Sequence, residues 1–320
     1  MPHAGVSLVG DIGATNARFA LVQPDGTMSS ARVYELNEHE SLYDAIEAFL
    51  SEEAPPVRPV QAVLAWASPI TGDQVTLTNH PWTFSITALR QQLSLKRLRV
   101  VNDFAANAAA IPYLGETDRI QIGGGAPEHD APIGIIGPGT GLGVSALARS
   151  GDNAMMIAGE GGHVTMSPTT AQESAILDVM RTRFDHVSAE RVLSGSGLVN
   201  LYNTLCELSG TPATSYTADQ ITSPRIWDDD PHTREATAIF CAMLGTVAGN
   251  LALTIGARGG IYIAGGIVPR IAAFFAQSEF RSRFEAKGRM RGYLAEIPTY
   301  LIVRPLPALL GAAAMLNEWR

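Results

Sequence analysis

The chain has 320 residues, 46% of them hydrophobic and 17% charged, a composition that excludes an intrinsically disordered protein and allows two domains. Its formal net charge of −8 argues against nucleic acid as a partner, because an acidic surface repels phosphate backbones. The two cysteines, Cys206 and Cys241, form no short-spaced metal pair and are too few for a disulfide scaffold, which fits a reducing cytoplasm.

The N-terminal residues Met-Pro-His-Ala-Gly lead straight into an apolar strand, without the basic region and long apolar stretch of a signal peptide. The most apolar segment, residues 245–268, is interrupted by Asn250, Arg258 and several glycines. We therefore expect the end of a buried helix followed by a buried strand, rather than a membrane span, and a cytoplasmic protein without a membrane partner.

The first third of the chain is predicted to alternate strands and helices. Short apolar runs bounded by Gly, Pro or Asp predict strands at 6–9, 17–22, 32–36, 60–66 and 98–101. Apolar residues at helical spacing predict a helix at 41–50, with Ser41 as its N-cap, and a short Ala-rich helix at 104–111.

The remainder begins with residues 115–132, a polar and glycine-rich stretch that predicts a linker or surface loop. Strands are predicted after it at 133–136, 144–148 and 261–264, and helices at 171–184, 197–208, 233–257 and 306–319. Residues 188–191 resemble a helix start with Glu190 in its first turn. The strand, glycine turn, strand pattern of residues 6–22 recurs at 133–148, which suggests two similar α/β halves.

Two glycine-rich turns are candidate phosphate sites. Glycine lets backbone N–H groups approach a ligand without a Cβ in the way, and successive N–H groups form an anion nest. The first turn consists of Gly10, Asp11, Ile12, Gly13, Ala14, Thr15 and Asn16, and the second has Gly139, Thr140 and Gly141 at its centre. Neither has Walker A or Rossmann spacing, so those two folds are excluded. Either turn alone is better explained as a plain hairpin turn, but two such turns, each between apolar strands and each with a Thr, together favour the phosphate site.

Asp11 adds a carboxylate to the first candidate nest. Phosphate repels a carboxylate unless a cation lies between them, so Asp11 suggests Mg²⁺, which keeps several waters and needs few protein ligands. The alternative is that Asp11 only caps the turn, as Asp often does.

Other polar residues form candidate binding or catalytic groups. Asn102 and Asp103 end an apolar strand, where α/β sheets place ligands, so Asp103 is a candidate general base or alternatively a helix N-cap. Glu160 and His163 stand three residues apart among glycines. No further Cys or His completes a zinc set, and the pair suits vicinal hydroxyls of a polyol, or packing of the histidine.

In their order along the chain, these segments resemble the bacterial glucokinases of the hexokinase–actin ATPase superfamily. The matching stretches are residues 8–18, 101–106, 136–143, 159–163, 190–195 and 263–267. The resemblance implies a two-domain α/β fold of the hexokinase/actin-like, ribonuclease H-like type with an interdomain active-site cleft. The small domain would comprise residues 1–104 and 305–320, and the large domain residues 105–304.

The resemblance also implies a role for each motif in ATP-dependent phosphorylation of glucose to glucose 6-phosphate. Both turns would cradle the phosphates of Mg-ATP, with Asp11 near Mg²⁺ through water, and Gly265-Gly266 would bind adenosine. Asp103 would be the general base. The sugar would be held by Asn102, Asp103, Glu160, His163 and Glu190. A homodimer is the family expectation.

The chain departs from the family pattern at Ala14, where many relatives have Gly, and at Ser196, where Pro is frequent. It lacks the Cys-rich zinc motif of the related ROK kinases, so it is similar to the zinc-free branch. Three alternatives stay open at this point. They are a kinase of another hexose (fructose, mannose or an N-acetylated sugar), a non-catalytic sugar sensor, and an actin- or chaperone-like ATPase.

Overall fold

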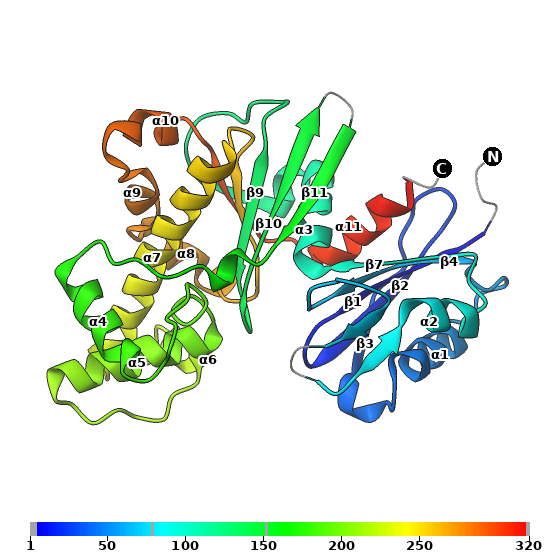
Figure 1. Cartoon of the computed structure of the whole chain (residues 1–320), viewed down its shortest axis with the longest axis horizontal. Coiled ribbons are helices and arrows are strands. Elements are labelled where there is room, and N and C mark those ends of the chain that lie inside the picture. Colours follow the sequence, from blue (N-terminus) through cyan, green and yellow to red (C-terminus); the bar gives the residue numbers. More distant parts are fainter. Residues whose placement is uncertain (1–4, 78–79, 151–152, 318–320) are drawn as a thin grey trace. The chain divides into compact units, whose positions relative to one another are not determined.

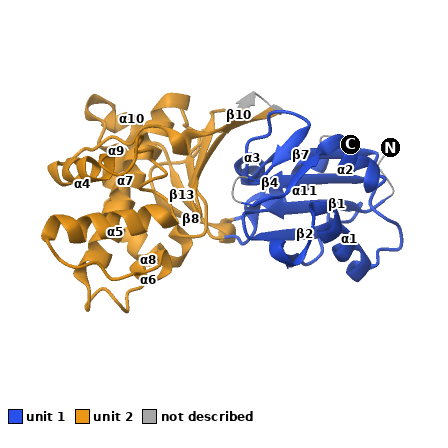
Figure 2. Ribbon diagram, turned by 60° about the horizontal axis from the view of Figure 1, so that its bottom comes forward, with its two compact units in different colours: residues 1–115, 304–320 blue, residues 116–303 orange. Residues whose placement is uncertain are grey.

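The computed structural model of the protein describes residues 5–77, 80–150 and 153–317 (Figure 1). The chain forms two compact units (Figure 2): unit 1 comprises Met1–Gly115 and Arg304–Arg320, and unit 2 comprises Glu116–Val303. The first four residues, on which the signal-peptide prediction bears, and the last residues of the predicted C-terminal helix lie outside the described residues.

Unit 1 is built on a five-stranded sheet of order β3-β2-β1-β4-β7. Its strands are β1 (Ser7–Ile12), β2 (Asn16–Val22), β3 (Arg32–Glu35), β4 (Gln61–Trp66) and β7 (Arg97–Asn102). The first three strands form an antiparallel meander, whereas β1, β4 and β7 run parallel. All five predicted strands of this part are confirmed. A small hairpin of β5 (Gln74–Thr76) and β6 (Thr83–Ser85) was not predicted.

Four α-helices accompany the described part of this sheet: α1 (Leu42–Glu53), α2 (Ile86–Gln92), α3 (Asp103–Ala110) and α11 (Pro307–Leu316), with short 3-10 turns η1 (Leu36–Glu38) and η2 (Ile111–Tyr113). The Ser41 hydroxyl accepts a hydrogen bond from Asp44 N, which confirms it as the N-cap of α1. Gly311 of α11 lies directly on α3, because a Cβ there would come within 1.7 Å of the Ala106 carbonyl oxygen. This packing makes α3 part of unit 1.

Unit 2 is built on a six-stranded sheet of order β11-β10-β9-β12-β13-β8. Its strands are β8 (Arg119–Gly123), β9 (Ile133–Pro138), β10 (Leu142–Ser150), β11 (Asn153–Gly159), β12 (Ile261–Ile263) and β13 (Thr299–Ile302). The β9–β10 hairpin is confirmed. The prediction of a loop over residues 115–132 is wrong in part, because β8 pairs with β13 at the edge of the sheet.

Helices make up much of the rest of unit 2. They are η3 (Glu116–Asp118), η4 (Gly161–His163), α4 (Ala171–Arg181), α5 (Gly195–Ser209), α6 (Ala218–Ile221), α7 (Pro231–Ile255), η5 (Val268–Ile271), α8 (Ala272–Gln277), α9 (Phe280–Glu285), η6 (Gly288–Met290) and α10 (Arg291–Ala295). The predicted helix start at 188–191 is wrong. Ser188 forms a β-bridge with Thr165, and the helix begins only at Gly195 behind its N-cap Ser194.

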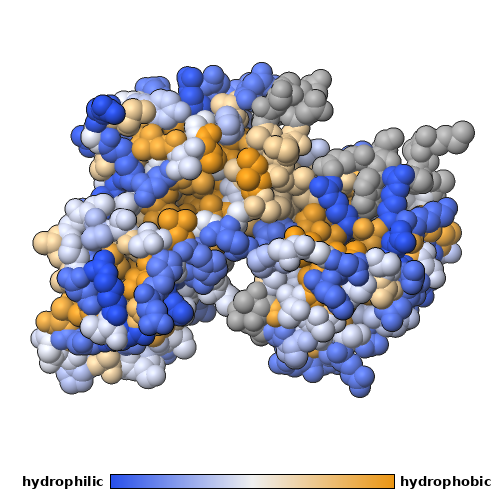
Figure 3. Space-filling view, in the orientation of Figure 1, coloured by the Kyte–Doolittle hydropathy of each residue, from blue (hydrophilic) through white to orange (hydrophobic). Residues whose placement is uncertain are grey.

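Among the described helices, α7 has the length and apolar composition that could cross a membrane. However, 56% of its most apolar stretch of 18 residues is buried within the protein. Apolar residues gather over the middle of unit 2, where α7 runs (Figure 3). Gly245 lies so close to α9 that a Cβ would come within 2.1 Å of the Phe280 carbonyl oxygen. The helix thus packs into the core of unit 2, and β12 follows it, as predicted.

Candidate active site

The first glycine turn joins β1 to β2 in unit 1. Gly13 N donates to the Asn16 carbonyl oxygen at 3.0 Å, and Leu36 N donates to the Thr15 carbonyl oxygen at 3.0 Å. Ala14 is not among the non-glycine residues with positive φ, so alanine fits here without backbone strain. Gly10 has a packing reason to be glycine, since a Cβ would come within 2.8 Å of Leu64.

Asp11 lies on β1 directly opposite Arg18 of β2. Its carboxylate is 3.6 Å from the Arg18 guanidinium, and its side chain is 16% exposed. Burial raises the pKa of Asp11, and the charge of Arg18 opposes that shift. The carboxylate sits in the strand and caps no turn N–H within the described residues, which removes the support for the capping alternative.

Asn102 and Asp103 lie where β7 ends and α3 begins. Asn102 is the N-cap, because its Oδ1 accepts from Phe104 N at 2.9 Å and from Ala105 N at 3.2 Å. The alternative that Asp103 caps this helix is therefore wrong. Asp103 is the first residue of α3 and is half-buried, with its Oδ1 accepting from Phe104 N at 2.9 Å.

Strand register brings the two acidic positions of unit 1 to one edge of the sheet. Ile12 pairs with Trp66, and Trp66 pairs with Asn102, in parallel strands. The carboxyl ends of β1 and β7 are therefore level and two strand spacings apart, about 10 Å. That edge carries Asp11 and Asp103.

The second glycine turn joins β9 to β10 in unit 2. Gly139 N donates to the Gly141 carbonyl oxygen at 2.8 Å, and Gly195 N donates to the Gly139 carbonyl oxygen at 2.9 Å. Thr140 is exposed. No heavy atom lies within 4 Å of the position of a Cβ on Gly139, so a ligand can approach the turn there, although both polar backbone groups of Gly139 are bonded within the protein.

Gly265 and Gly266 follow β12, which runs parallel to β9. Gly265 has φ +84° and lies so close to the second turn that a Cβ would come within 2.1 Å of the Pro138 carbonyl oxygen. Only glycine suits both constraints. No heavy atom lies within 4 Å of the Cβ position of Gly266. The structure therefore brings the predicted adenosine motif next to the predicted phosphate turn.

The predicted sugar residues of unit 2 gather around η4. His163 Nε2 is 3.9 Å from Glu160 Oε2, and both side chains are more than half exposed. Glu190 joins them, because its N–H donates to the Gly162 carbonyl oxygen at 2.8 Å. Its Oε2 accepts from Leu142 N at 2.8 Å.

His163 and Glu190 line a pocket of about 500 Å³. Sequence reasoning missed its other walls: Arg183, Phe184, Asp185, His186, Ser188 and Arg191. The Arg191 guanidinium lies 4.5 Å over the Phe184 ring, and His186 Nε2 is 3.0 Å from Thr165 Oγ1. No motif spacing signals these residues, since they reach the pocket through the turn that precedes α5.

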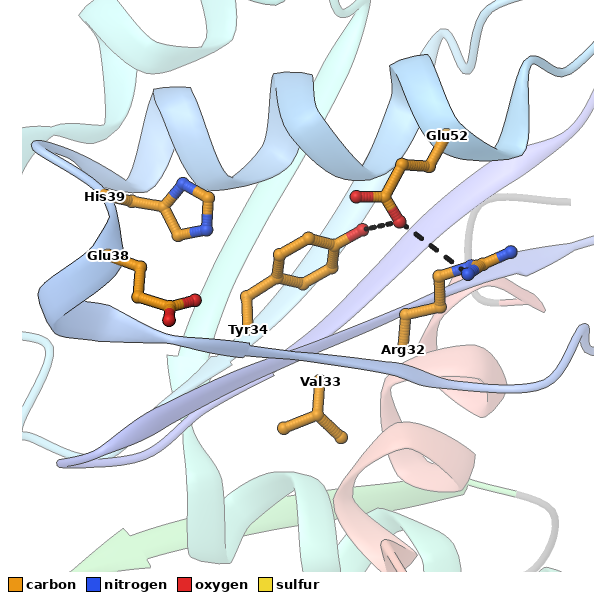
Figure 4. A pocket seen from close by; sticks show the side chains of 6 residues that line it. All are labelled: Arg32, Val33, Tyr34, Glu38, His39 and Glu52. Carbon is orange, nitrogen blue, oxygen red and sulfur yellow. Dashed lines mark hydrogen bonds and ion pairs between the residues drawn. The ribbon is translucent and has the colours of Figure 1, made fainter.

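A second pocket, of about 440 Å³, lies in unit 1 between β3 and α1 (Figure 4). Tyr34 OH donates to Glu52 Oε2 at 3.0 Å, and Arg32 pairs with Glu52 and with Glu53. Burial, followed by the bond to Glu52, raises the pKa of Tyr34 to about 12. These contacts tie β3 to α1 and explain the polar lining without a ligand.

Mg²⁺ takes oxygen ligands and keeps several waters, so it needs few protein side chains. No group of three or more His, Cys, Asp or Glu side chains in those residues could hold a metal ion by itself. A single partly buried carboxylate, Asp11, beside a backbone nest fits Mg²⁺ held largely by phosphate and water. It does not fit a structural zinc ion, which takes four protein ligands.

A glycine turn between antiparallel strands in each of two α/β units, together with a strand-end Asn-Asp pair in unit 1, defines the hexokinase–actin class of kinases. A family model described as Glucokinase matches residues 8–319. The glucokinase of Paramagnetospirillum magneticum is 52% identical over 312 residues, which is 97% of this chain and 97% of that protein. The chain belongs to the glucokinase family.

Solved structures agree with this assignment. The crystal structure of a glucokinase from an Antarctic psychrotroph matches with a TM-score of 0.88 and 36% identity, covering 98% of this chain and 99% of that one. The glucokinase of Balamuthia mandrillaris, in complex with glucose, matches with a TM-score of 0.83 over 98% of this chain and 93% of that one. Its 19% identity shows the fold alone.

Proposed function

We propose that this chain transfers the γ-phosphoryl group of ATP to the 6-hydroxyl of D-glucose, giving glucose 6-phosphate and ADP. The glucose kinase activity is supported by membership of the glucokinase family. The observation that carries the chemistry is the shared sheet edge of Asp11 and Asp103 in unit 1. A general base and a phosphate-side carboxylate are thereby held at fixed separation by backbone pairing.

Asp103 acts as the general base. Its carboxylate takes the proton of the 6-hydroxyl as the oxygen forms its bond to the γ-phosphorus, while the bond from phosphorus to the β,γ-bridging oxygen breaks and ADP leaves. Asn102 fixes the start of α3 and thereby the position of Asp103. Asn102, Asp103, Glu160, His163 and Glu190 hold the sugar hydroxyls, and hydrogen bonds to charged groups are worth about 1.5–3 kcal/mol each.

The nucleotide is held by backbone rather than by side-chain cations. The turns Gly10–Asn16 and Gly139–Gly141 offer the phosphates those N–H groups that are not bonded within the protein; the N–H groups of Gly13 and Gly139 are used inside the turns themselves. Gly265-Gly266 leave room for adenosine. Mg²⁺ would lie near Asp11, through water, and supplies charge neutralisation to the transferred phosphoryl group. We further propose a cytoplasmic homodimer that acts on small molecules and not on nucleic acid or membrane.

A coupled assay of ADP release with Mg-ATP over a panel of hexoses tests this function. We expect turnover strongest with glucose and little ADP release without sugar. Greater turnover with fructose, mannose or an N-acetylated sugar would show that this sugar, and not glucose, is the substrate, and the proposed mechanism would still apply. Glucose binding without turnover with any sugar would support a sensor instead.

A further inference from the structure

Glu190 lies between the sugar pocket and the second glycine turn of unit 2. Its Oε2 accepts a hydrogen bond from Leu142 N at 2.8 Å, where the turn passes into β10. Glu190 also lines the 500 Å³ pocket beside His163. Within the described residues Oε1 has no hydrogen-bond donor, so one carboxylate oxygen is engaged by the turn and the other is available.

Gly141 shows how closely this carboxylate fits the turn. A Cβ on Gly141 would come within 2.4 Å of Glu190 Oε2, which is well inside van der Waals contact. The carboxylate therefore occupies the space that any side chain at 141 would need. The glycine is required by Glu190 as well as by the access of a phosphate to the backbone.

The backbone of Glu190 is itself anchored on both sides. Its N–H donates to the Gly162 carbonyl oxygen at 2.8 Å, and its carbonyl oxygen accepts from the Ser194 hydroxyl at 2.8 Å. Gly195, which follows, donates to the Gly139 carbonyl oxygen at 2.9 Å. These hydrogen bonds therefore hold the backbone around Glu190 in a fixed position relative to the backbone of the Gly139–Gly141 turn.

We infer that Glu190 is a positioning residue for the nucleotide in addition to a sugar ligand: Oε2 fixes the Gly139–Gly141 turn while Oε1 faces the sugar. The inference rests on the proposed function. A turn that is already fixed loses little conformational entropy when its N–H groups bind phosphate. Loss of the carboxylate should therefore weaken nucleotide binding even when no sugar is present.

Three substitutions separate this role from a sugar contact. In Glu190→Gln the carboxamide oxygen still accepts from Leu142 N, so the turn is kept while the charge toward the sugar is lost. In Glu190→Ala both are lost. His163→Ala is the matched control, because His163 lines the same pocket but has no hydrogen bond to the turn among the described residues.

The readout is calorimetric binding of Mg-AMPPNP to the sugar-free protein. We expect the Kd to rise about tenfold in Glu190→Ala, and to stay within about threefold of wild type in Glu190→Gln and His163→Ala. All three should raise the KM for glucose. Circular dichroism and thermal unfolding identify any variant that fails to fold.

Gly141→Ala tests the same contact from the turn. Its methyl group displaces the Glu190 carboxylate, so the KM for glucose rises although residue 141 makes no proposed sugar contact. In the Glu190→Ala background the same change should have no further effect on glucose. Additive effects, or wild-type nucleotide affinity in Glu190→Ala, would overturn the inference. Wild-type protein that binds Mg-AMPPNP but phosphorylates no sugar would instead refute the proposed function.

Discussion

Replacing Asp103 with asparagine should remove catalysis while leaving the fold intact. An asparagine Oδ1 still accepts from Phe104 N, the bond that Asp103 makes at 2.9 Å, and Asn102 continues to cap α3. The free energy of unfolding should fall by no more than about 1 kcal/mol, the usual worth of a carboxylate in the first turn of a helix. General-base help is worth about 10²–10⁴-fold in rate, so the barrier should rise by about 3–5 kcal/mol.

The assay is coupled ADP release for kcat, together with calorimetric binding of glucose to the same protein. We expect kcat to fall by about 10²–10⁴-fold and the Kd for glucose to change by less than about tenfold, since the amide still hydrogen-bonds a hydroxyl. Asp44→Asn is the matched control, because Asp44 is also an acidic residue in the first turn of a helix. A kcat within a few-fold of wild type for Asp103→Asn would refute the assignment of the base.

Three further predictions concern stability, pH and thiol chemistry. Gly311→Ala should lower the free energy of unfolding by about 1–3 kcal/mol, because its methyl group overpacks the contact between α3 and α11. Burial raises the pKa of Asp11, so affinity for Mg-ATP should fall as the pH drops through that raised pKa, and Asp11→Asn should flatten this dependence. Burial raises the pKa of Cys241 to about 12 and also raises that of Cys206, so neither thiol should react with a disulfide reagent until the protein is unfolded.

A control variant or an opposite result can contradict the three expectations on stability, pH and thiol reactivity. Gly292→Ala, where no heavy atom lies within 4 Å of the added Cβ, should leave the unfolding temperature nearly unchanged, and equal losses in both variants would contradict the packing argument. Because the pKa of Asp11 is raised in the folded state, ionisation of Asp11 lowers the free energy of unfolding as the pH rises through that pKa. Asp11→Asn should therefore unfold at a higher temperature than wild type at neutral pH, and a lower one would contradict the burial. Rapid labelling of either native cysteine would contradict its buried environment.

The sequence located the motifs and most elements of both sheets, because hydrophobic period and glycine punctuation are local signals. Ser41 illustrates this, since an N-cap depends on residues only three positions away. The loop predicted over 115–132 failed because β8 is an edge strand whose pairing with β13 comes from far along the chain. Its half-exposed residues lack a continuous apolar run.

The site residues show the same division. The glycine turns and the Asn-Asp pair were visible as motifs, and the helix predicted at 188–191 was wrong because Ser188 and Glu190 bond to residues 161–165 instead of starting a helix. The bond between Leu142 and Glu190 joins residues 48 positions apart. No local pattern specifies such a contact, and it emerges only from the packing of η4 and α5 against the β9–β10 hairpin.

The stoichiometry of the wild-type reaction, with ADP and glucose 6-phosphate measured in the same sample, tests the transfer of the phosphoryl group from ATP to glucose. We expect one glucose 6-phosphate to form for each ADP released, and no phosphorylated product from 6-deoxyglucose, which lacks the accepting hydroxyl. ADP release without glucose 6-phosphate, or at an equal rate in the absence of sugar, would contradict this transfer.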